Sequence, residues 1–297
     1  MNDEVLIAAE KMRQYIVTHL AEDIQPEDVA RVAGYSLRHG SRLFKSATGK
    51  GLSEYIRLLR LSSAAQSLAD APANVLDVAL SHRYDSHEGF TKAFTSAFGV
   101  GPRAYRKGGR PIQYFIPYPV STPETMFQRK DGPMNKNIIT ASFVPRSERK
   151  LILQYSNTGT DYWSFCQERG CDWEGLLLSI KERMDIPAFL NLPVSMIPQG
   201  RAVGAVGIEV PQDYAGQVPG DYEMVALPAG EMLYFQSQPY EREDAFPDAI
   251  KSVFDAYENY DPTAYGYTFD MENLPVFNFG AFTDKGARIA VPVKKRK

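Results

Sequence analysis

VARVAGYSLRHGSRLFKSATG, at residues 29–49, aligns with DVALSHRYDSHEGFTKAFTSAFG, at residues 77–99, so the chain contains an internal repeat. Each copy reads as a short apolar helix, a tight turn and a second helix. That second helix is opened by Ser36 or Ser86, whose hydroxyl can accept hydrogen bonds from free backbone amides. Gly49 and Gly99 fit the ends of the second helices. The repeat predicts an all-α N-terminal domain with two helix-turn-helix units.

A long helix is expected between the two copies, because LSEYIRLLRLSSAAQSLAD places its apolar residues at helical spacing. Ahead of the first copy, Leu6, Ala9, Met12, Ile16 and Leu20 predict a further amphipathic helix. If the connecting helix holds the second helices about 34 Å apart, both can enter successive major grooves on one face of a duplex. The arrangement therefore predicts double-stranded DNA as the partner, with a helical bundle that never touches DNA as the alternative.

The polar side chains of the two second helices are the candidate DNA contacts. Arg38 and Arg42 share a helix face, and arginine suits a bidentate contact with guanine. Glu88 can accept from cytosine or stabilise its helix N-terminus. The predicted DNA-binding residues are Arg38, His39, Ser41, Arg42, Lys45, His87, Glu88, Thr91 and Lys92.

GYSLRHGSRLFKSATGKGLSEYIRLLRLSSAAQSL, followed by DVALSHRYDSHEGFTKAFTSAFGVGPRAYRK, resembles the DNA-binding domain of the AraC family of transcription regulators. The resemblance covers residues 5–107 and includes the terminal FGVGPRAYR. It implies recognition helices at 37–46 and 87–97, and RNA polymerase as a further candidate partner. Two residues depart from the family pattern. Gly40, inside a recognition helix, costs about 1 kcal/mol relative to alanine, and Arg83 replaces a turn glycine. Both are expected to loosen the domain.

Charge is divided between the two parts of the chain. Residues 1–110 carry 15 Lys and Arg against 12 Asp and Glu, a net charge of +3, whereas the other 187 residues carry −6. Only two cysteines occur, which indicates a reducing compartment rather than a disulfide scaffold. The acidic start MNDEVLIAAEKM lacks the features of a secretory signal, and no apolar run is long enough to span a membrane. A cytoplasmic protein without a membrane partner is expected.

The prolines and glycines of residues 109–137 predict a linker, with an apolar stretch at 112–118 that is partly anchored. The expected domains are 1–108, the linker 109–137, and 138–297. In the last of these, groups of strands alternate with helices, which predicts an α+β domain of two similar halves. Strand-like segments are 138–144, 150–156, 201–211, 222–229, 231–238, 264–271, 275–282 and 287–293, and helical segments are 160–170, 171–185 and 242–260.

GIEVP at 207–211, LPAGEMLYF at 227–235 and RIAVPV at 288–293 resemble the GyrI-like effector-binding domain. The resemblance implies two pseudo-symmetric halves and a small organic ligand in an aromatic cleft, often with an acidic residue that faces a cationic drug. Here Arg288 stands near that acidic position, and the acidic alternatives elsewhere in the domain are Glu174, Glu182, Glu209 and Glu223. Arg288 either points into the cleft, favouring an anionic or carbonyl-bearing ligand, or is solvated on an edge strand. The predicted ligand-binding residues are Tyr162, Trp163, Trp173, Tyr234, Phe277, Phe279 and Arg288.

Enzymatic chemistry is disfavoured in the C-terminal part, because all four histidines lie before residue 110. A serine–histidine or cysteine–histidine pair and a histidine-based zinc site are therefore excluded there. Cys166 and Cys171, five residues apart, are poor metal ligands, and no cofactor or metal is expected. Two alternatives to a ligand-responsive regulator stay open. One is a C-terminal domain that docks a protein partner, and the other is a GyrI-like hydrolase using a carboxylate and a tyrosine.

Overall fold

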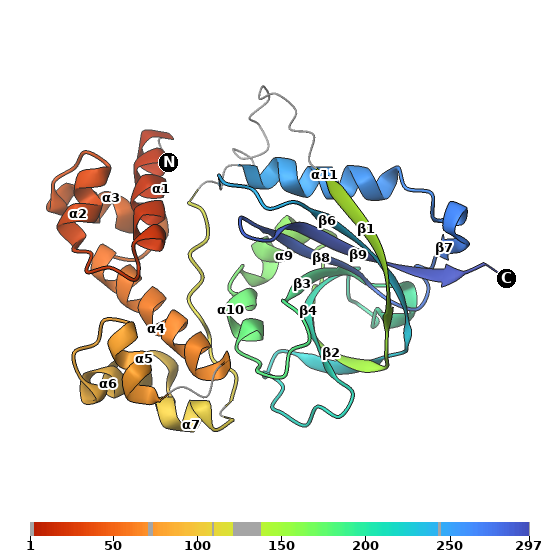
Figure 1. The fold of residues 1–297 in the computed structure, drawn as a ribbon, viewed down its shortest axis with the longest axis horizontal. Helices are drawn as coiled ribbons and strands as arrows, with labels where there is room; N and C mark the ends of the chain where they lie inside the picture. The colour runs from red at the N-terminus through yellow and green to blue at the C-terminus, as the bar shows by residue number, and fades with distance from the viewer. Residues whose placement is uncertain (1–2, 71–73, 109, 121–137, 243–244, 297) are drawn as a thin grey trace. The chain divides into compact units, whose positions relative to one another are not determined.

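The structure, a computed structural model, describes residues 3–70, 74–108, 110–120, 138–242 and 245–296. The chain divides into two compact units, one of Met1–Thr125 with Glu174–Lys181 and the other of Met126–Trp173 with Glu182–Lys297. Figure 1 shows that the first unit is helical and that the second is built on a sheet. The predicted helical N-terminal domain and sheet-containing C-terminal domain are confirmed.

The first unit contains two similar pairs of helices joined by a long helix. We call α2 and α3 the first helix pair and α5 and α6 the second helix pair; α4 connects them. The helices are α1 (Asp3–Thr18), α2 (Pro26–Val32), α3 (Leu37–Thr48), α4 (Leu52–Asp70), α5 (Val75–Ser81), α6 (His87–Phe98) and α7 (Pro102–Arg106).

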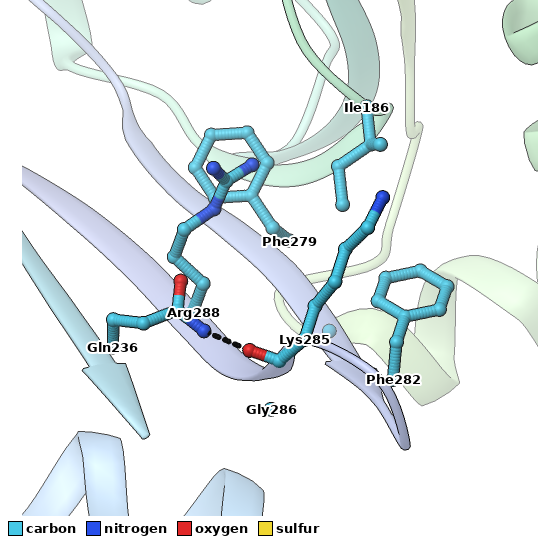
Figure 2. A pocket seen from close by; sticks show the side chains of 8 residues that line it. Ile186, Gln236, Phe279, Phe282, Lys285, Gly286 and Arg288 are labelled. Carbon is cyan, nitrogen blue, oxygen red and sulfur yellow. Dashed lines mark hydrogen bonds between the residues drawn. The ribbon is translucent and has the colours of Figure 1, made fainter. Parts of the chain in front are cut away.

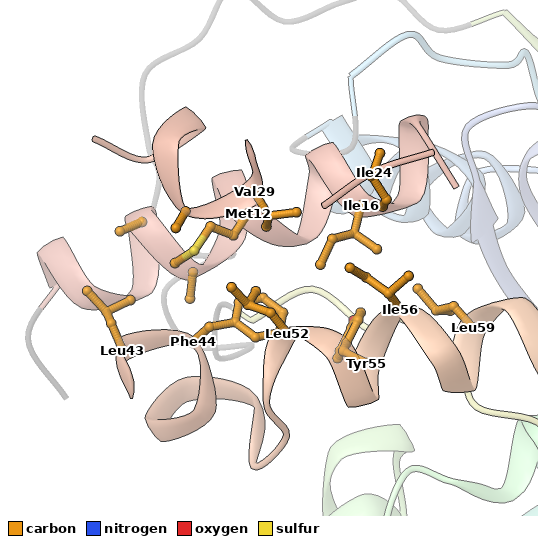
Figure 3. Close-up of a cluster of buried hydrophobic side chains, with 13 residues drawn as sticks. Met12, Ile16, Ile24, Val29, Leu43, Phe44, Leu52, Tyr55, Ile56 and Leu59 are labelled. Carbon is orange, nitrogen blue, oxygen red and sulfur yellow. The ribbon is translucent and has the colours of Figure 1, made fainter. Parts of the chain in front are cut away.

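The first helix pair closes over a hydrophobic core that it shares with α1 and the start of α4 (Figure 3). Met12 and Ile16 of α1 meet Val29 of α2 and Phe44 of α3, and all four side chains are fully buried. Tyr55 of α4 contacts the Phe44 ring edge-on, with centroids 5.0 Å apart. The apolar stripe predicted for α1 is therefore the face that packs inward.

Gly40 lies where α3 presses against α2. A Cβ atom at this position would stand 2.7 Å from the Cβ of Ala30, which is closer than two such carbons approach. The glycine therefore permits the two helices to pack closely. This packing role runs against the expectation that Gly40 loosens the domain.

The second helix pair has its own core. Phe90 and Phe94 of α6 are fully buried beside Val78 of α5, Leu68 of α4 and Tyr105 of α7. The Phe90 and Phe94 rings lie 5.5 Å apart at 60°, and the Phe94 and Tyr105 rings 5.9 Å apart. This spacing suits aromatic side chains that pack off-parallel.

Residues 110–120, which we call the strap, belong to the predicted linker and run without helix or strand. Ile112 and Tyr114 are buried in the core of the second helix pair, and the Tyr114 hydroxyl lies 2.5 Å from that of Tyr105. Phe115, the next residue, packs against the core of the first helix pair, 4.7 Å from the Tyr55 ring. The strap therefore joins both cores. Residue 109 and residues 121–137 of the predicted linker lie outside the described residues.

Polar contacts also fix the strap. The backbone amide of Phe115 donates to the Ser62 hydroxyl at 2.7 Å. The buried guanidinium of Arg13, held by Glu10, donates to the carbonyl of Pro117 at 2.9 Å. A proline-rich segment leaves backbone groups unpaired, and side chains from α1 and α4 supply partners for them.

The segment Glu174–Lys181 packs within the first unit. It holds all of α10 (Trp173–Leu178) except the first residue. The backbone amide of Ile112 donates to the Ser179 hydroxyl at 2.9 Å. Lys181 donates to the carbonyl of Tyr105 at 2.7 Å, and its ammonium lies 5.0 Å from the Tyr105 ring. The helix expected over 171–185 ends early, at Leu178.

The second unit holds a nine-stranded antiparallel sheet in the order β1-β6-β9-β8-β3-β4-β2-β5, with β7 paired to β9 off this path. The elements are β1 (Ile139–Arg146), β2 (Arg149–Tyr155), α9 (Tyr162–Arg169), β3 (Ala188–Asn191), η1 (Val194–Met196), β4 (Gly204–Pro211), β5 (Glu223–Leu227), β6 (Gly230–Ser237), α11 (Phe246–Glu258), η3 (Pro262–Tyr265), β7 (Tyr267–Phe269), β8 (Val276–Phe282) and β9 (Gly286–Lys295).

The strand order has a mirror relation about the junction of β8 and β3. Read inward from the two ends, β1-β6-β9-β8 corresponds to β5-β2-β4-β3. In chain order, β2, α9, β3 and β4 then correspond to β6, α11, β8 and β9. The sheet is thus two similarly built sets of strands joined edge to edge.

β3 completes this junction, although no strand was expected there. It pairs with β4 on one side and with β8 on the other. Ala188, Phe189 and Leu190 are all buried, so both faces of the strand are covered. A strand covered on both faces shows no alternation of polar and apolar residues.

The two faces of the sheet have different coverings. On the outer face, α11 packs its buried Ala249 and Val253 against Leu233 and Ile289, and α9 packs Phe165 against Phe189. Figure 1 shows α11 lying across one set of strands. The inner face carries the other side chains of the same strands, including Met232, Phe277 and Ala290, around a second core.

Candidate functional sites

α3 is a capped helix with one buried side and one cationic side. The Ser36 hydroxyl accepts from the His39 amide, and Gly49, at φ 74°, ends the helix, as the sequence predicts. Leu43 and Phe44 are buried with Gly40. The exposed side chains at the other surface are Arg38, His39, Arg42 and Lys45, whereas Ser41 is half-buried.

Arg38, Arg42 and Lys45 form the cationic face of α3. Their spacing of four and then three residues places them on one surface of the helix. No acidic side chain occurs anywhere in α3. The His39 ring stacks on Tyr35 at 4.9 Å with an interplanar angle of 9°, which fixes it beside this face.

α6 has the same kinds of cap as α3, but the charges of its exposed side chains differ. The Ser86 hydroxyl accepts from the Gly89 amide at 3.1 Å, and Gly99, at φ 67°, ends the helix. Glu88 and Lys92 are exposed, so the two charges offset each other. His87 and Thr91 are half-buried; their Nε2 and Oγ1 atoms are out of solvent and have no hydrogen-bond partner within the described part of the chain.

The turn of the second helix pair holds a residue in a strained conformation. Arg83 has φ 66°, a value unique among the non-glycine residues that the structure describes. At the matching place in the first pair stands Gly34, with φ 82°. The Arg83 guanidinium donates to the carbonyl of Ala21 at 2.7 Å, so the side chain ties the second turn to the loop after α1. This tie runs against the expectation that Arg83 loosens the domain.

On the inner face of the sheet, four of the predicted ligand-binding residues come together. Tyr234 and Phe277 lie opposite Ala290 in neighbouring strands, which places them on one face. The Phe279 ring stacks 5.8 Å from Phe277 and 6.2 Å from Tyr234. The Arg288 guanidinium lies 4.0 Å from the centre of the Phe279 ring.

Arg288 is held rather than solvated. β9 lies between β6 and β8, so it is not an edge strand. The guanidinium pairs with the Asp185 carboxylate, and it also lies 5.8 Å from the centre of the Tyr234 ring. Arg288 is therefore not a solvated residue on an edge strand, and its side chain lies against the rings of Tyr234 and Phe279.

A cavity of about 250 Å³ opens beside Arg288 (Figure 2). Figure 2 shows the Lys285 side chain extending toward Ile186, and the Arg288 guanidinium over the Phe279 ring. Gln236 donates through its amide to the carbonyl of Lys285, which holds the β8–β9 turn against β6. The cavity is lined by Ile186, Gln236, Phe279, Gly280, Phe282, Lys285, Gly286 and Arg288.

A buried charge cluster lies on the same inner face, and Glu209 is its only member that was a candidate from the sequence. The Glu209 carboxylate pairs with Arg146 of β1 and with Arg149 of β2. Glu209 is 3% exposed and Arg149 is fully buried. β1 stands at one end of the strand order and β2 next to the other end, yet only residues 147 and 148 separate them, so the sheet curls until its two sets of strands meet. The signal in the sequence was a charged residue inside the apolar run GAVGIEVP.

Two guanidinium groups share one carboxylate in this cluster. Arg146 Nε and Arg149 Nη2 are buried, and neither has a hydrogen-bond partner among the described residues. Burial raises the pKa of the Tyr234 phenol, and the charges of both the Arg146–Glu209 pair and the Arg288–Asp185 pair act on it. Tyr234 therefore lies between the charge cluster and the cavity.

The other three predicted ligand-binding residues lie on the outer face. The Tyr162 ring contacts Phe189 edge-on at 6.4 Å, and Phe189 points away from the inner face because its neighbour Leu190 lies opposite Phe277. Trp163 and Trp173 surround Tyr162, with ring centroids at 4.7 Å and 6.2 Å. The structure thus separates these rings from Tyr234, Phe277, Phe279 and Arg288.

Metal ligation and membrane insertion find no support in the described parts of the chain. No group of three His, Cys, Asp or Glu side chains there could hold a metal ion. The same residues include no helix that is long and apolar enough to cross a membrane. Cys166 and Cys171 are half-buried free thiols, and the contact between them raises the pKa of Cys166.

Comparison with known proteins assigns the helical unit to a class. Residues 29–108 match a sequence family described as "Helix-turn-helix domain". The chain is 36% identical over 99 residues to the uncharacterized HTH-type transcriptional regulator YbfP of Bacillus subtilis, covering 33% of this chain and 34% of YbfP. It is 42% identical over 89 residues to the Right origin-binding protein of Escherichia coli K12, covering 30% and 31%. The match thus spans about a third of the length of each of these relatives.

A shorter relative is matched over most of its length. The chain is 39% identical over 93 residues to the transposon Tn10 TetD protein of Escherichia coli, covering 31% of this chain and 67% of that protein. The helical unit therefore makes this a helix-turn-helix protein. The chain belongs to the AraC family of transcriptional regulators.

Solved structures give two further likenesses. A transcriptional regulator with an AraC-type DNA-binding domain from Chromobacterium violaceum is 25% identical, with a TM-score of 0.34, over 36% of this chain and 95% of that one. The EcmrR C-terminal domain is 11% identical, with a TM-score of 0.35, over 54% of this chain and 99% of that one.

Proposed function

We propose that this protein is a sequence-specific regulator of transcription that binds double-stranded DNA through two helix-turn-helix units. The observation that carries the proposal is the cationic face of α3, where Arg38, Arg42 and Lys45 stand opposite the buried side of a helix capped at both ends. Such a helix can lie in a major groove. α6, with the same caps, is the second recognition helix, and α4 is the spacer between them.

The exposed side chains divide by the kind of DNA contact they can make. Arg38 and Arg42 have the donors for a bidentate contact with guanine, and Glu88 can accept from cytosine. Lys45 and Lys92 suit phosphate contacts, which position a protein without reading sequence. The remaining members of the proposed interface are His39, Ser41, His87 and Thr91. We also propose that the protein contacts RNA polymerase at the promoter and that it acts in the cytoplasm.

The C-terminal domain is proposed to be a GyrI-like sensor of a small organic ligand. Support comes from the cavity beside Arg288 and from the stacked rings of Tyr234, Phe277 and Phe279 next to it. Pockets for small molecules combine apolar walls with a few placed polar groups, and this cavity has both. Tyr162, Trp163 and Trp173 are left out of the proposed ligand site, because they lie on the outer face of the sheet.

The DNA-binding proposal is tested by selecting random duplexes with the full-length protein. We expect one enriched sequence with two sub-sites about one helical turn apart, and an affinity that falls steeply as salt rises. The double variant Arg38→Glu with Arg42→Glu should lose the selection while its circular dichroism is unchanged. The single variants Arg38→Glu and Arg42→Glu should each weaken the selection, and Lys11→Glu, the same single charge reversal at an exposed position of α1, is their matched control. Failure to enrich any sequence contradicts the proposal.

The sensor proposal is tested by thermal unfolding in the presence of a panel of hydrophobic cations, acids and neutral ring compounds. A ligand at 100 times its Kd should stabilise the protein by about 2.7 kcal/mol. If no compound shifts the unfolding temperature, the alternative of a protein-docking domain takes over. Turnover of a panel compound would instead favour the hydrolase alternative.

A further inference from the structure

The cavity beside Arg288 has an unequal distribution of charge. Lys285 and Arg288 both line it, and none of its lining residues is acidic. One carboxylate, that of Asp185, lies next to Ile186 in the chain and pairs with Arg288. The Lys285 ammonium is exposed and has no partner among the described residues. The cavity therefore offers one unpaired cation and one arginine that is only partly used.

Arg288 retains donors for a second acceptor. A guanidinium has five N–H groups in a planar fork, and Asp185 accepts from Nη2 alone. The guanidinium is held in place by Asp185 and by the Phe279 ring, whose centre lies 4.0 Å away. An arginine fixed in this way is prepared for a planar anion, because little side-chain freedom is lost when the anion binds.

The rest of the inner face adds positive charge. Arg146 and Arg149 share the single carboxylate of Glu209. One buried N–H on each guanidinium has no acceptor among the residues that the structure describes, and buried donors of this kind are normally satisfied. An acceptor brought by a ligand or by water is the ordinary explanation. A cationic ligand placed on this face would meet more positive than negative side chains.

The cavity is partly open to solvent, and its volume indicates what its walls can surround. Its 250 Å³ is smaller than the roughly 300–1,000 Å³ of pockets that hold drug-sized molecules. A dry cavity of about 150 Å³ holds one benzene molecule. The space therefore fits a single ring with a small polar group, with Phe279 and Phe282 as apolar walls.

We propose that this cavity selects a small organic anion, a single planar ring bearing a carboxylate, whose oxygens accept from Arg288 and Lys285 while the ring packs on Phe279 and Phe282. The inference rests on the proposed sensor function and names the chemical class of its ligand. It differs from recognition of hydrophobic cations by an acidic residue, which the resemblance to GyrI-like domains implies.

The test uses calorimetric titration of the full-length protein with benzoate, benzamide and benzamidine, three probes of nearly equal shape with charges of −1, 0 and +1. We expect benzoate to bind about 10- to 100-fold more tightly than the other two, since hydrogen bonds to charged groups are the stronger ones. Arg288→Gln should abolish this preference, and Lys285→Gln should reduce it severalfold. Lys294→Gln, on the same strand and away from the cavity, should leave it unchanged.

Asp185→Asn should change benzoate affinity in the opposite direction from Arg288→Gln. Removing the competing carboxylate should free Arg288 and tighten benzoate binding, whereas a purely structural role for the Arg288–Asp185 pair predicts weaker binding. That weaker binding would overturn the proposal, as would benzoate affinity that is unaffected by Arg288→Gln.

The outcomes also separate this inference from the sensor proposal. Equal or tighter binding of benzamidine or benzamide overturns the inference and leaves a ligand site in place. Absence of benzoate binding up to about 10 mM overturns the inference as well. The sensor proposal falls with it only if the larger cations and neutral ring compounds of the thermal panel also fail to bind.

Discussion

The two helix pairs share a backbone plan and differ in surface chemistry. In each pair a serine caps the second helix and a glycine at positive φ ends it. α3 then exposes three cations and no carboxylate, whereas α6 exposes Glu88 beside Lys92. The caps are dictated by the free backbone groups at any helix end, but nothing in the fold dictates the exposed face. The first pair therefore carries most of the charge that would bind DNA.

The two turns differ in a way that shows how a repeat diverges. Gly34 and Arg83 both have positive φ, which glycine adopts without strain. Arg83 accepts the strain and uses its guanidinium to hold the carbonyl of Ala21. The two turns thus share a backbone conformation, which Gly34 adopts without strain and which Arg83 adopts together with a long-range hydrogen bond.

The largest expected change in the free energy of unfolding comes from strap variants, which test how far each helix pair depends on the strap. Tyr114→Ala should destabilise the protein by about 3–5 kcal/mol, because it empties a buried aromatic site in the core of the second pair. Phe115→Ala, at a half-buried site against the first pair, should cost about 1–3 kcal/mol. Urea unfolding followed by circular dichroism measures both.

Tyr114→Phe is the matched control for this pair of variants. It keeps the ring and removes the hydroxyl, which contacts that of Tyr105, and a loss of about 1 kcal/mol is expected. If Tyr114→Ala costs no more than the control, the strap is not part of the core of the second pair.

The next prediction compares the exposed faces of the two helices. Arg42→Ala should weaken binding to the selected sequence more than binding to random DNA, with about 1–3 kcal/mol of discrimination lost. Lys92→Ala should weaken binding to all sequences alike and reduce the salt slope by about 1. Fluorescence anisotropy at several salt concentrations separates the two. A uniform loss for Arg42→Ala would make it a phosphate contact.

A smaller effect is expected from the glycines inside the two helices. Gly40→Ala should destabilise the protein by about 1–2 kcal/mol, because the clash with Ala30 outweighs the gain in helix propensity. At Gly89 the nearest atom to a new Cβ is the Ser86 hydroxyl, at 3.1 Å. Gly89→Ala should therefore be neutral or stabilise by up to about 1 kcal/mol. Stabilisation by Gly40→Ala, seen in thermal unfolding, would contradict the packing role.

The smallest effect is expected at the turn of the second pair. Arg83→Gly relieves positive-φ strain of about 1–2 kcal/mol and loses a hydrogen bond of about 1 kcal/mol, so stability should change by less than about 1 kcal/mol. Arg83→Ala keeps the strain and loses the bond, and should destabilise by about 0.5–1.5 kcal/mol. If the two variants are equally stable, the positive φ carries no strain.

Local signals were sufficient for most of the helical unit. The repeat, the serine caps and the glycine ends predict α3 and α6, and apolar spacing predicts α1 and α4, all as observed. The packing of the strap was not predictable from its composition. Its backbone groups are held by side chains about 50 to 100 positions earlier in the chain, those of Ser62 and Arg13.

In the second unit, the sequence indicated most strands but not how their faces are used. β3 was missed because four residues between prolines, buried on both sides, show no period. Six of the seven predicted ligand-binding residues were chosen by aromatic character, which says nothing about the side of the sheet on which a ring lies. Pairing of Arg146 with Glu209 depends on the curl of the sheet, and no local pattern encodes that curl.

The division of the chain into units has a consequence during synthesis. The first unit is complete only when Glu174–Lys181 has been made, about 60 residues after the strap ends at Val120. At roughly 5–20 residues per second, the ribosome needs about 3–12 s to supply those residues. During that interval the carbonyls of Tyr105 and Arg106 cannot accept the hydrogen bonds that Lys181 later donates. The nascent chain therefore holds a nearly finished N-terminal unit for several seconds before its last piece emerges.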